Sequence, residues 1–194
     1  AKAGLGIDLW VIRLWATLPD EALRVLLNII YLALDGKVPV QLLLILIGLM
    51  PKDKGGERPI ALTPMLYRVA MKLAKRSIAE WDQEAAGFWD TAIAGNSRLR
   101  AARCRSLGVE LAVARGFSAV GILWDISAFF DSIRIHRLVD LALGLGFPPL
   151  VLRLSLKVHT AARAFKEGPY VSHFLKPAGI SILAGCGASV SFTR

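Results

Sequence analysis

Two acidic residues and an aromatic residue stand close together in the middle of the chain, at Asp125, Phe130 and Asp131. The run at 117–124 is apolar and rich in strand formers, so we expect a strand over 117–125 that ends in the Asp125 carboxylate. A charge at the end of a buried strand is costly without a partner, and such an acid often binds a metal ion. Nucleotidyl transfer by two metal ions needs carboxylates of this kind. The simpler alternative is that Asp125 caps the next turn and that Asp131 begins the following helix.

Basic side chains mark two other segments. Lys52 and Arg58 flank a Gly-Gly turn between short apolar stretches, which predicts a β-hairpin near 50–62. Basic residues beside a Gly-Gly turn are by default solvated. A helix predicted over 97–115 carries four arginines in its first half, which either contact a nucleic-acid backbone or form a solvated face. These four are Arg98, Arg100, Arg103 and Arg105.

The overall charge favours a polyanionic partner. Lys and Arg number 24 against 15 Asp and Glu, a net charge of +9, and the pI is near 10. Nucleic acid is the first candidate and an anionic membrane surface the second. The two cysteines lie far apart, and neither they nor the three histidines have the spacing of metal ligands. We therefore expect a reduced intracellular protein.

The mean hydropathy of +0.51 raises the alternative of a membrane-associated helical protein. The most apolar window, 42–50, is short, whereas a spanning helix needs about 20 apolar residues. We therefore expect no membrane partner. No signal peptide opens the chain, which begins without Met, and we expect it to be a piece of a longer protein.

The pattern of elements indicates an α+β fold, because strands and helices do not alternate regularly. Any domain boundary is expected near Gly116, which gives a mostly helical region at 1–116 and a second region at 117–194. Gly-rich and small residues at 179–191 indicate a close approach of the backbone to a ligand or another chain. Helices are predicted over 20–34, 97–115, 134–145 and 150–164, and a further helix is predicted from residue 65. We expect a buried segment over 40–50 and hairpins over 52–58 and 165–175.

The sequence DISAFFD at 125–131 resembles the first catalytic motif of reverse transcriptases of the non-LTR retrotransposon and group II intron type. Upstream, MPKDKGGERPIAL at 50–62 is similar to the family's fingers segment, with Pro-Lys, a short turn and Arg-Pro-Ile. KAGLGID at 2–8 resembles the family's opening Lys-Ala-x-Gly-x-Asp, and GKVP at 36–39 its Gly-x-x-Pro. AGCGAS at 184–189 is similar to its Gln-Gly-x-x-x-Ser motif. These segments stand in the family's order and cover nearly the whole chain.

The resemblance implies part of a right-hand polymerase, with fingers at 1–116, the front part of the palm at 117–194, and the thumb and the rest of the palm absent. It implies that Asp125 ligates both catalytic Mg²⁺ ions of the complete enzyme, assisted by the carbonyl of Ile126. Phe130 would stack beneath the incoming sugar and exclude a 2′-hydroxyl, although a core aromatic is the commoner role for such a residue.

The remaining roles concern the nucleotide. Lys52 and Arg58 would grip its triphosphate, and Gly185 would let the backbone pass close to the nucleotide and the template base. Two positions depart from the family: Ala184 replaces the usual Gln, and Ser181 a usual Gly. The second catalytic motif, an aromatic followed by two aspartates, does not occur within 1–194. We therefore expect this fragment alone to be inactive.

The expected parent protein is an RNA-directed DNA polymerase that adds deoxynucleotides to a primer 3′-end. Its partners would be an RNA template, a DNA primer and deoxynucleoside triphosphates. The alternative is a non-catalytic, nucleic-acid-binding remnant of a retroelement. Ala184, the missing initiator Met and the end of the chain before the second catalytic motif motivate it. Retroelement enzymes of this kind commonly work in the nucleus or the cytoplasm, so the resemblance implies one of these two compartments.

Overall fold

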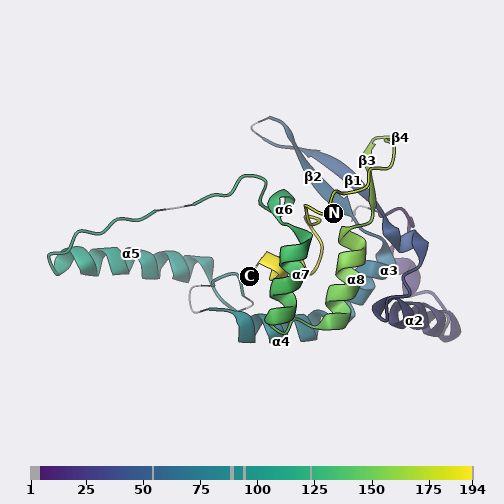
Figure 1. Ribbon diagram of the computed structural model, residues 1–194, viewed down its shortest axis with the longest axis horizontal. Coiled ribbons are helices and arrows are strands. Elements are labelled where there is room, and N and C mark those ends of the chain that lie inside the picture. Colours follow the sequence, from purple (N-terminus) through teal and green to yellow (C-terminus); the bar gives the residue numbers. More distant parts are fainter. Residues whose placement is uncertain (1–4, 54, 88–89, 94, 123, 194) are drawn as a thin grey trace.

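A computed structural model of the chain describes residues 5–53, 55–87, 90–93, 95–122 and 124–193. These residues form a mixed α+β fold with one four-stranded sheet, so the predicted α+β class is confirmed (Figure 1). Residues 2–4 of the opening motif lie outside the described residues. The helices are α1 (Ile12–Trp15), α2 (Asp20–Leu34), α3 (Met65–Leu73), α4 (Lys75–Ala85), α5 (Arg98–Ala114), α6 (Phe129–Ser132), α7 (Ile135–Gly144) and α8 (Pro149–His159), with 3₁₀ turns η1 (Val40–Leu43) and η2 (Ser191–Thr193).

The sheet has the strand order β2-β1-β3-β4. Its strands are β1 (Leu44–Pro51), β2 (Glu57–Leu62), β3 (Ala162–Glu167) and β4 (Tyr170–Val171). β1 pairs antiparallel with β2 and parallel with β3, and β3 pairs antiparallel with β4. Both predicted hairpins are confirmed. The division near Gly116 stays a prediction, and β1 pairs with β3 across it.

The predicted helix over 150–164 is too long. α8 ends at His159, and Ala162 to Ala164 pair with Leu44 to Leu46 of β1 instead. Pairing with the buried strand β1 gives the backbone N–H and C=O groups of residues 162–164 the hydrogen bonds that a longer helix would have provided. It also buries Ala164 completely. α8 itself is the most buried helix of the fold and packs against α2 and α7.

The beginning of the described chain docks on the start of α3. A β-carbon at Gly6 would lie 2.6 Å from the backbone oxygen of Thr63, so only glycine fits this contact. The carboxylate of Asp8 accepts a hydrogen bond from the backbone N–H of Met65, the first residue of α3. An acid at a helix N-terminus binds an unpaired N–H and complements the helix dipole. These two residues of the opening motif therefore have a structural role.

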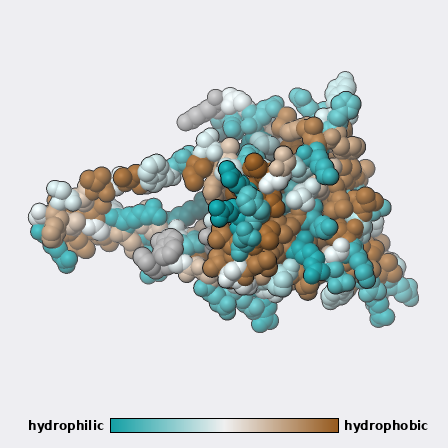
Figure 2. Space-filling model, in the orientation of Figure 1, coloured by the Kyte–Doolittle hydropathy of each residue, from teal (hydrophilic) through white to brown (hydrophobic). Residues whose placement is uncertain are grey.

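α5 and the segment after it project from the rest of the chain (Figure 1). α5 has no buried residue, and apolar and polar side chains are mixed along this arm (Figure 2). The predicted strand over 117–125 is wrong: its described residues, 117–122 and 124–125, form no strand. Trp124 is 87% exposed and Val120 86%. The apolar run is rich in strand formers, but a ladder needs a partner strand, and the described residues of this segment pair with none.

Among the described residues, no helix has both the length and the apolar character that a membrane span requires.

Candidate functional site

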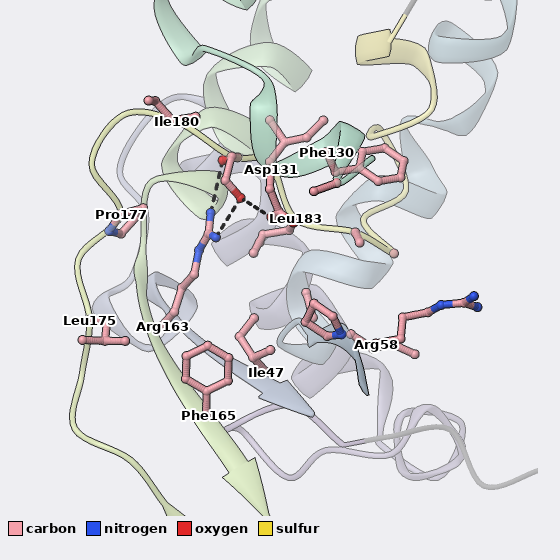
Figure 3. Close-up of a pocket in the computed structure, with 18 of the residues that line it drawn as sticks. Ile47, Arg58, Phe130, Asp131, Arg163, Phe165, Leu175, Pro177, Ile180 and Leu183 are labelled. Atoms are coloured by element: carbon pink, nitrogen blue, oxygen red, sulfur yellow. Dashed lines mark hydrogen bonds between the residues drawn. The ribbon is translucent and has the colours of Figure 1, made fainter. Parts of the chain in front are cut away.

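A cavity of about 850 Å³ opens between the sheet, α6 and the loop at 175–185. Figure 3 shows Ile47 of β1 and Phe165 of β3 beside each other, Leu175 and Pro177 on one side, and Arg58 and Phe130 on the other. The lining is mainly apolar, with few polar groups, which is typical of a small-molecule site. The lining includes Ile47, Arg58, Phe130, Asp131, Arg163, Phe165, Lys176, Ser181, Ile182 and Gly185.

The charged residues of this cavity are unbalanced. Arg58, Arg163 and Lys176 line it, and Asp131 is the one acid among its described lining residues. A surplus of positive charge in a partly apolar cleft favours an anionic ligand that also has an apolar or planar part.

Backbone hydrogen bonds join the loop to the segment that begins with α6. The N–H of Ile182 donates to the carbonyl of Phe130 at 2.9 Å, and the N–H of Ser181 donates to the carbonyl of Ile133 at 2.9 Å. The N–H of Ile135 donates to the carbonyl of Gly179 at 3.0 Å. This pairing places Phe130 beside the loop and makes both of them cavity wall.

A polar network links β3 to α6 through the loop. Nη1 of Arg163 donates to Oγ of Ser181 at 3.1 Å, and the Ser181 hydroxyl donates to Oδ1 of Asp131 at 3.0 Å. Nη2 of Arg163 donates to the carbonyls of His159 at 3.0 Å and Ser181 at 3.2 Å. Burial lowers the pKa of Arg163, and the charge of Asp131 opposes this effect. The guanidinium is therefore held in one position at the cavity edge (Figure 3).

The loop is also fixed from its buried side by α8. Nδ1 of His159 accepts a hydrogen bond from the N–H of Leu183 at 2.8 Å, and His159 is completely buried. Burial lowers the pKa of His159 to about 3, and the nearby charge of Arg163 contributes. The imidazole is therefore neutral at ordinary pH, which suits its role as an acceptor.

Cys186 follows the cavity residue Gly185 and belongs to the core. Its Sγ lies 2.8 Å from the hydroxyl of Tyr67, which in turn lies 3.3 Å from Oγ of Ser155. Burial raises the pKa of both the Cys186 thiol and the Tyr67 phenol. Both groups are therefore neutral, and the thiol is not a nucleophile. Gly185 has φ of +89°, a conformation that glycine adopts without strain.

The structure brings three of the predicted site residues together: Arg58, Phe130 and Gly185 all line the cavity. It does not bring Lys52, Asp125 or Ile126 into the lining, and all three are exposed. The arginine cluster lies outside the cavity, on the projecting helix α5, and all four of its members are exposed.

Sequence reasoning missed Arg163, Lys176 and the linking function of Ser181. A signal for Arg163 was present, because the large residues Arg163 and Phe165 alternate with Ala162 and Ala164, as the two faces of a strand do. Assignment of 150–164 to a helix concealed that pattern. No spacing in the sequence connects Arg163, Ser181 and Asp131, which meet only through the fold.

The described carboxylates do not assemble a magnesium site in this arrangement. Asp131 accepts a hydrogen bond from Ser181, while Asp125 lies on the exposed segment outside the cavity. Among the described residues, no three His, Cys, Asp or Glu side chains form a group that could hold a metal ion. Magnesium stays a prediction from the motif.

The chain matches no protein-family model, and no curated protein matches its sequence.

Proposed function

We propose that this chain is the fingers and front part of the palm of an RNA-directed DNA polymerase, and that the cavity receives the incoming deoxynucleoside triphosphate. One observation carries the proposal: Arg58, Phe130 and Gly185 line the same cavity of about 850 Å³. They belong to three separate motifs of the sequence, and the resemblance assigns each of them to the nucleotide.

The chemistry of the lining supports a nucleotide. The guanidinium of Arg58 offers a planar pair of donors for phosphate oxygens, and Lys176 adds a point charge. Phe130, Phe165 and Ile182 offer apolar surface for the sugar and the base. Gly185 carries no side chain, so a ligand can approach the backbone closely.

Magnesium enters the proposal only through the motif at Asp125. A bound Mg²⁺ would neutralise charge that develops on the transferred phosphoryl group. No step is assigned to it, because the described carboxylates do not gather into a site for it.

Primer extension by the protein that carries this chain tests the proposal. We expect it to extend a DNA primer on an RNA template with deoxynucleoside triphosphates and Mg²⁺. Asp125→Asn should abolish synthesis, whereas Asp140→Asn, at an exposed carboxylate on α7, should leave it intact. Synthesis that survives Asp125→Asn contradicts the role of Asp125, and the absence of any synthesis by the unaltered protein contradicts the polymerase.

A second function, a non-catalytic nucleic-acid-binding protein of a retroelement, is favoured by α5. Its four arginines are all exposed on a helix with no buried residue, so each is free to meet a phosphate backbone. Salt-dependent binding of RNA without any primer extension would select this function.

A further inference from the structure

The backbone of Ser181 adopts a conformation that residues other than glycine rarely adopt. Its φ is +85°, in the left-handed region. A non-glycine residue in this region is strained, and it stays there only because its surroundings hold it. The reverse transcriptases that the chain resembles usually have glycine at this position, so the serine brings both strain and a hydroxyl that a glycine would lack.

The Ser181 hydroxyl uses both of its hydrogen-bonding functions. It accepts from Nη1 of Arg163 at 3.1 Å and donates to Oδ1 of Asp131 at 3.0 Å. The hydroxyl therefore links a cation on β3 to an acid on α6. The other terminal nitrogen of Arg163, Nη2, donates to the carbonyl of His159 at 3.0 Å. Each hydrogen bond in this link involves a charged partner, which makes it stronger than a neutral one.

Asp131 directly follows Phe130 in the short helix α6. The carbonyl of Phe130 accepts from the N–H of Ile182, the residue directly after Ser181. The loop therefore holds α6 at two neighbouring positions. Ile182 bonds to Phe130 through the backbone, and Ser181 bonds to Asp131 through the side chains. Without the Ser181 hydroxyl, the backbone hydrogen bonds between the loop and the α6 segment would remain, as would the bond from Nη2 of Arg163 to the Ser181 carbonyl. The side-chain link from Arg163 to Asp131 would be lost.

We propose that Ser181 is a positioning residue, which links Arg163 to Asp131 and so holds Phe130 at the cavity wall where it distinguishes deoxyribose from ribose. This inference rests on the proposed function. The selectivity of the cavity for a 2′-deoxy sugar then depends on a hydroxyl that does not contact the nucleotide itself.

Calorimetric titration of the protein with dATP and with ATP tests this role, because the two nucleotides differ only in the 2′-hydroxyl. The unaltered protein is expected to bind dATP more tightly. Ser181→Ala should reduce the ratio of the two dissociation constants, with an upper limit of about 10- to 100-fold, the range that a hydrogen bond to a charged group contributes. Ser181→Gly should reduce it equally while relieving the backbone strain, which covers the case in which Ser181→Ala does not fold.

The acid provides the matched variants. Asp131→Asn keeps an acceptor oxygen for the hydroxyl and should preserve most of the ratio, whereas Asp131→Ala should reproduce the loss. Ser106→Ala, which removes a 3.3 Å bond from a hydroxyl to Glu110 on the distant helix α5, should change nothing.

The outcomes separate this inference from the proposed function. If the unaltered protein binds neither nucleotide, the proposed nucleotide cavity is wrong. If it prefers dATP and both Ser181 variants keep that preference, or lose affinity for dATP and ATP equally, the positioning role is wrong and the cavity stands. Equal binding of dATP and ATP by the unaltered protein also overturns the positioning role.

Discussion

Nδ1 of His159 accepts a hydrogen bond from the backbone N–H of Leu183 at 2.8 Å. This contact joins the end of α8 to the loop that forms one wall of the cavity. It requires an unprotonated Nδ1, so the proton of the neutral ring is on Nε2, which has no hydrogen-bond partner among the described residues. Protonation at Nδ1 would break the contact and place a buried charge beside Arg163.

The first prediction concerns acid stability. The pKa of His159 is about 3 in the folded chain, against 6.5 for an unperturbed histidine. Below pH 6.5 the unfolded state therefore binds more protons than the folded state, and the free energy of unfolding falls as the pH is lowered from about 6.5 toward 3. The limit of this loss is on the order of 5 kcal/mol.

Urea denaturation across this pH range measures the effect. His159→Asn places an oxygen near the position of Nδ1 but cannot titrate, so it should flatten the pH dependence whatever its cost at neutral pH. His173→Asn, at an exposed histidine, should keep the slope of the unaltered protein. An unchanged slope in His159→Asn would contradict this assignment.

The second prediction concerns the docking of Gly6. A β-carbon at this position would lie 2.6 Å from the backbone oxygen of Thr63, which is too close for any side chain. Gly6→Ala should lower the free energy of unfolding by about 1–3 kcal/mol. Gly108→Ala is the control, because nothing lies within 4 Å of its added carbon and alanine favours the interior of α5. Equal thermal stability of Gly6→Ala and the unaltered protein would contradict this close contact.

The third prediction concerns the projecting helix. Replacement of the four α5 arginines by glutamine should weaken binding of single-stranded RNA and flatten its salt dependence, by about 0.7 in the log–log slope per lost phosphate contact. Glutamine is a good helix former, so α5 itself should persist. Arg13→Gln together with Arg24→Gln, at exposed sites on α1 and α2, removes half as many positive charges elsewhere, and its effect per lost charge is the control. Filter binding over a series of salt concentrations gives the slope, and an unchanged slope would assign the arginines to a solvated face.

Elements with a strong local pattern could be predicted from the sequence. α2, α5 and α7 lie within one or two residues of the predicted helices, and the Gly-Gly turn before Arg58 gave the correct hairpin. The strand over 117–125 failed for a physical reason. An apolar run of strand formers shows that a segment could lie in a sheet, whereas pairing depends on another strand lying beside it.

The residues of the cavity that belong to local motifs could be predicted from the sequence. Arg58, Phe130 and Gly185 each belong to a local motif, so the sequence identified them separately. The link from Arg163 through Ser181 to Asp131 joins β3, the loop and α6, and a contact between distant segments leaves no spacing to recognise. In the sequence, His159 likewise has no spacing that assigns it a role, because its partner Leu183 is brought to it only by the fold.

Equilibrium binding of dATP to the protein tests the nucleotide cavity most directly. Arg58→Ala should weaken binding by about 10- to 100-fold, the range for a hydrogen-bonded charge. Arg58→Lys should restore part of the affinity, and Arg24→Ala should leave it unchanged. The account predicts saturable binding that depends on Arg58; equal affinity of Arg58→Ala and the unaltered protein, or no binding of dATP at all, would contradict it.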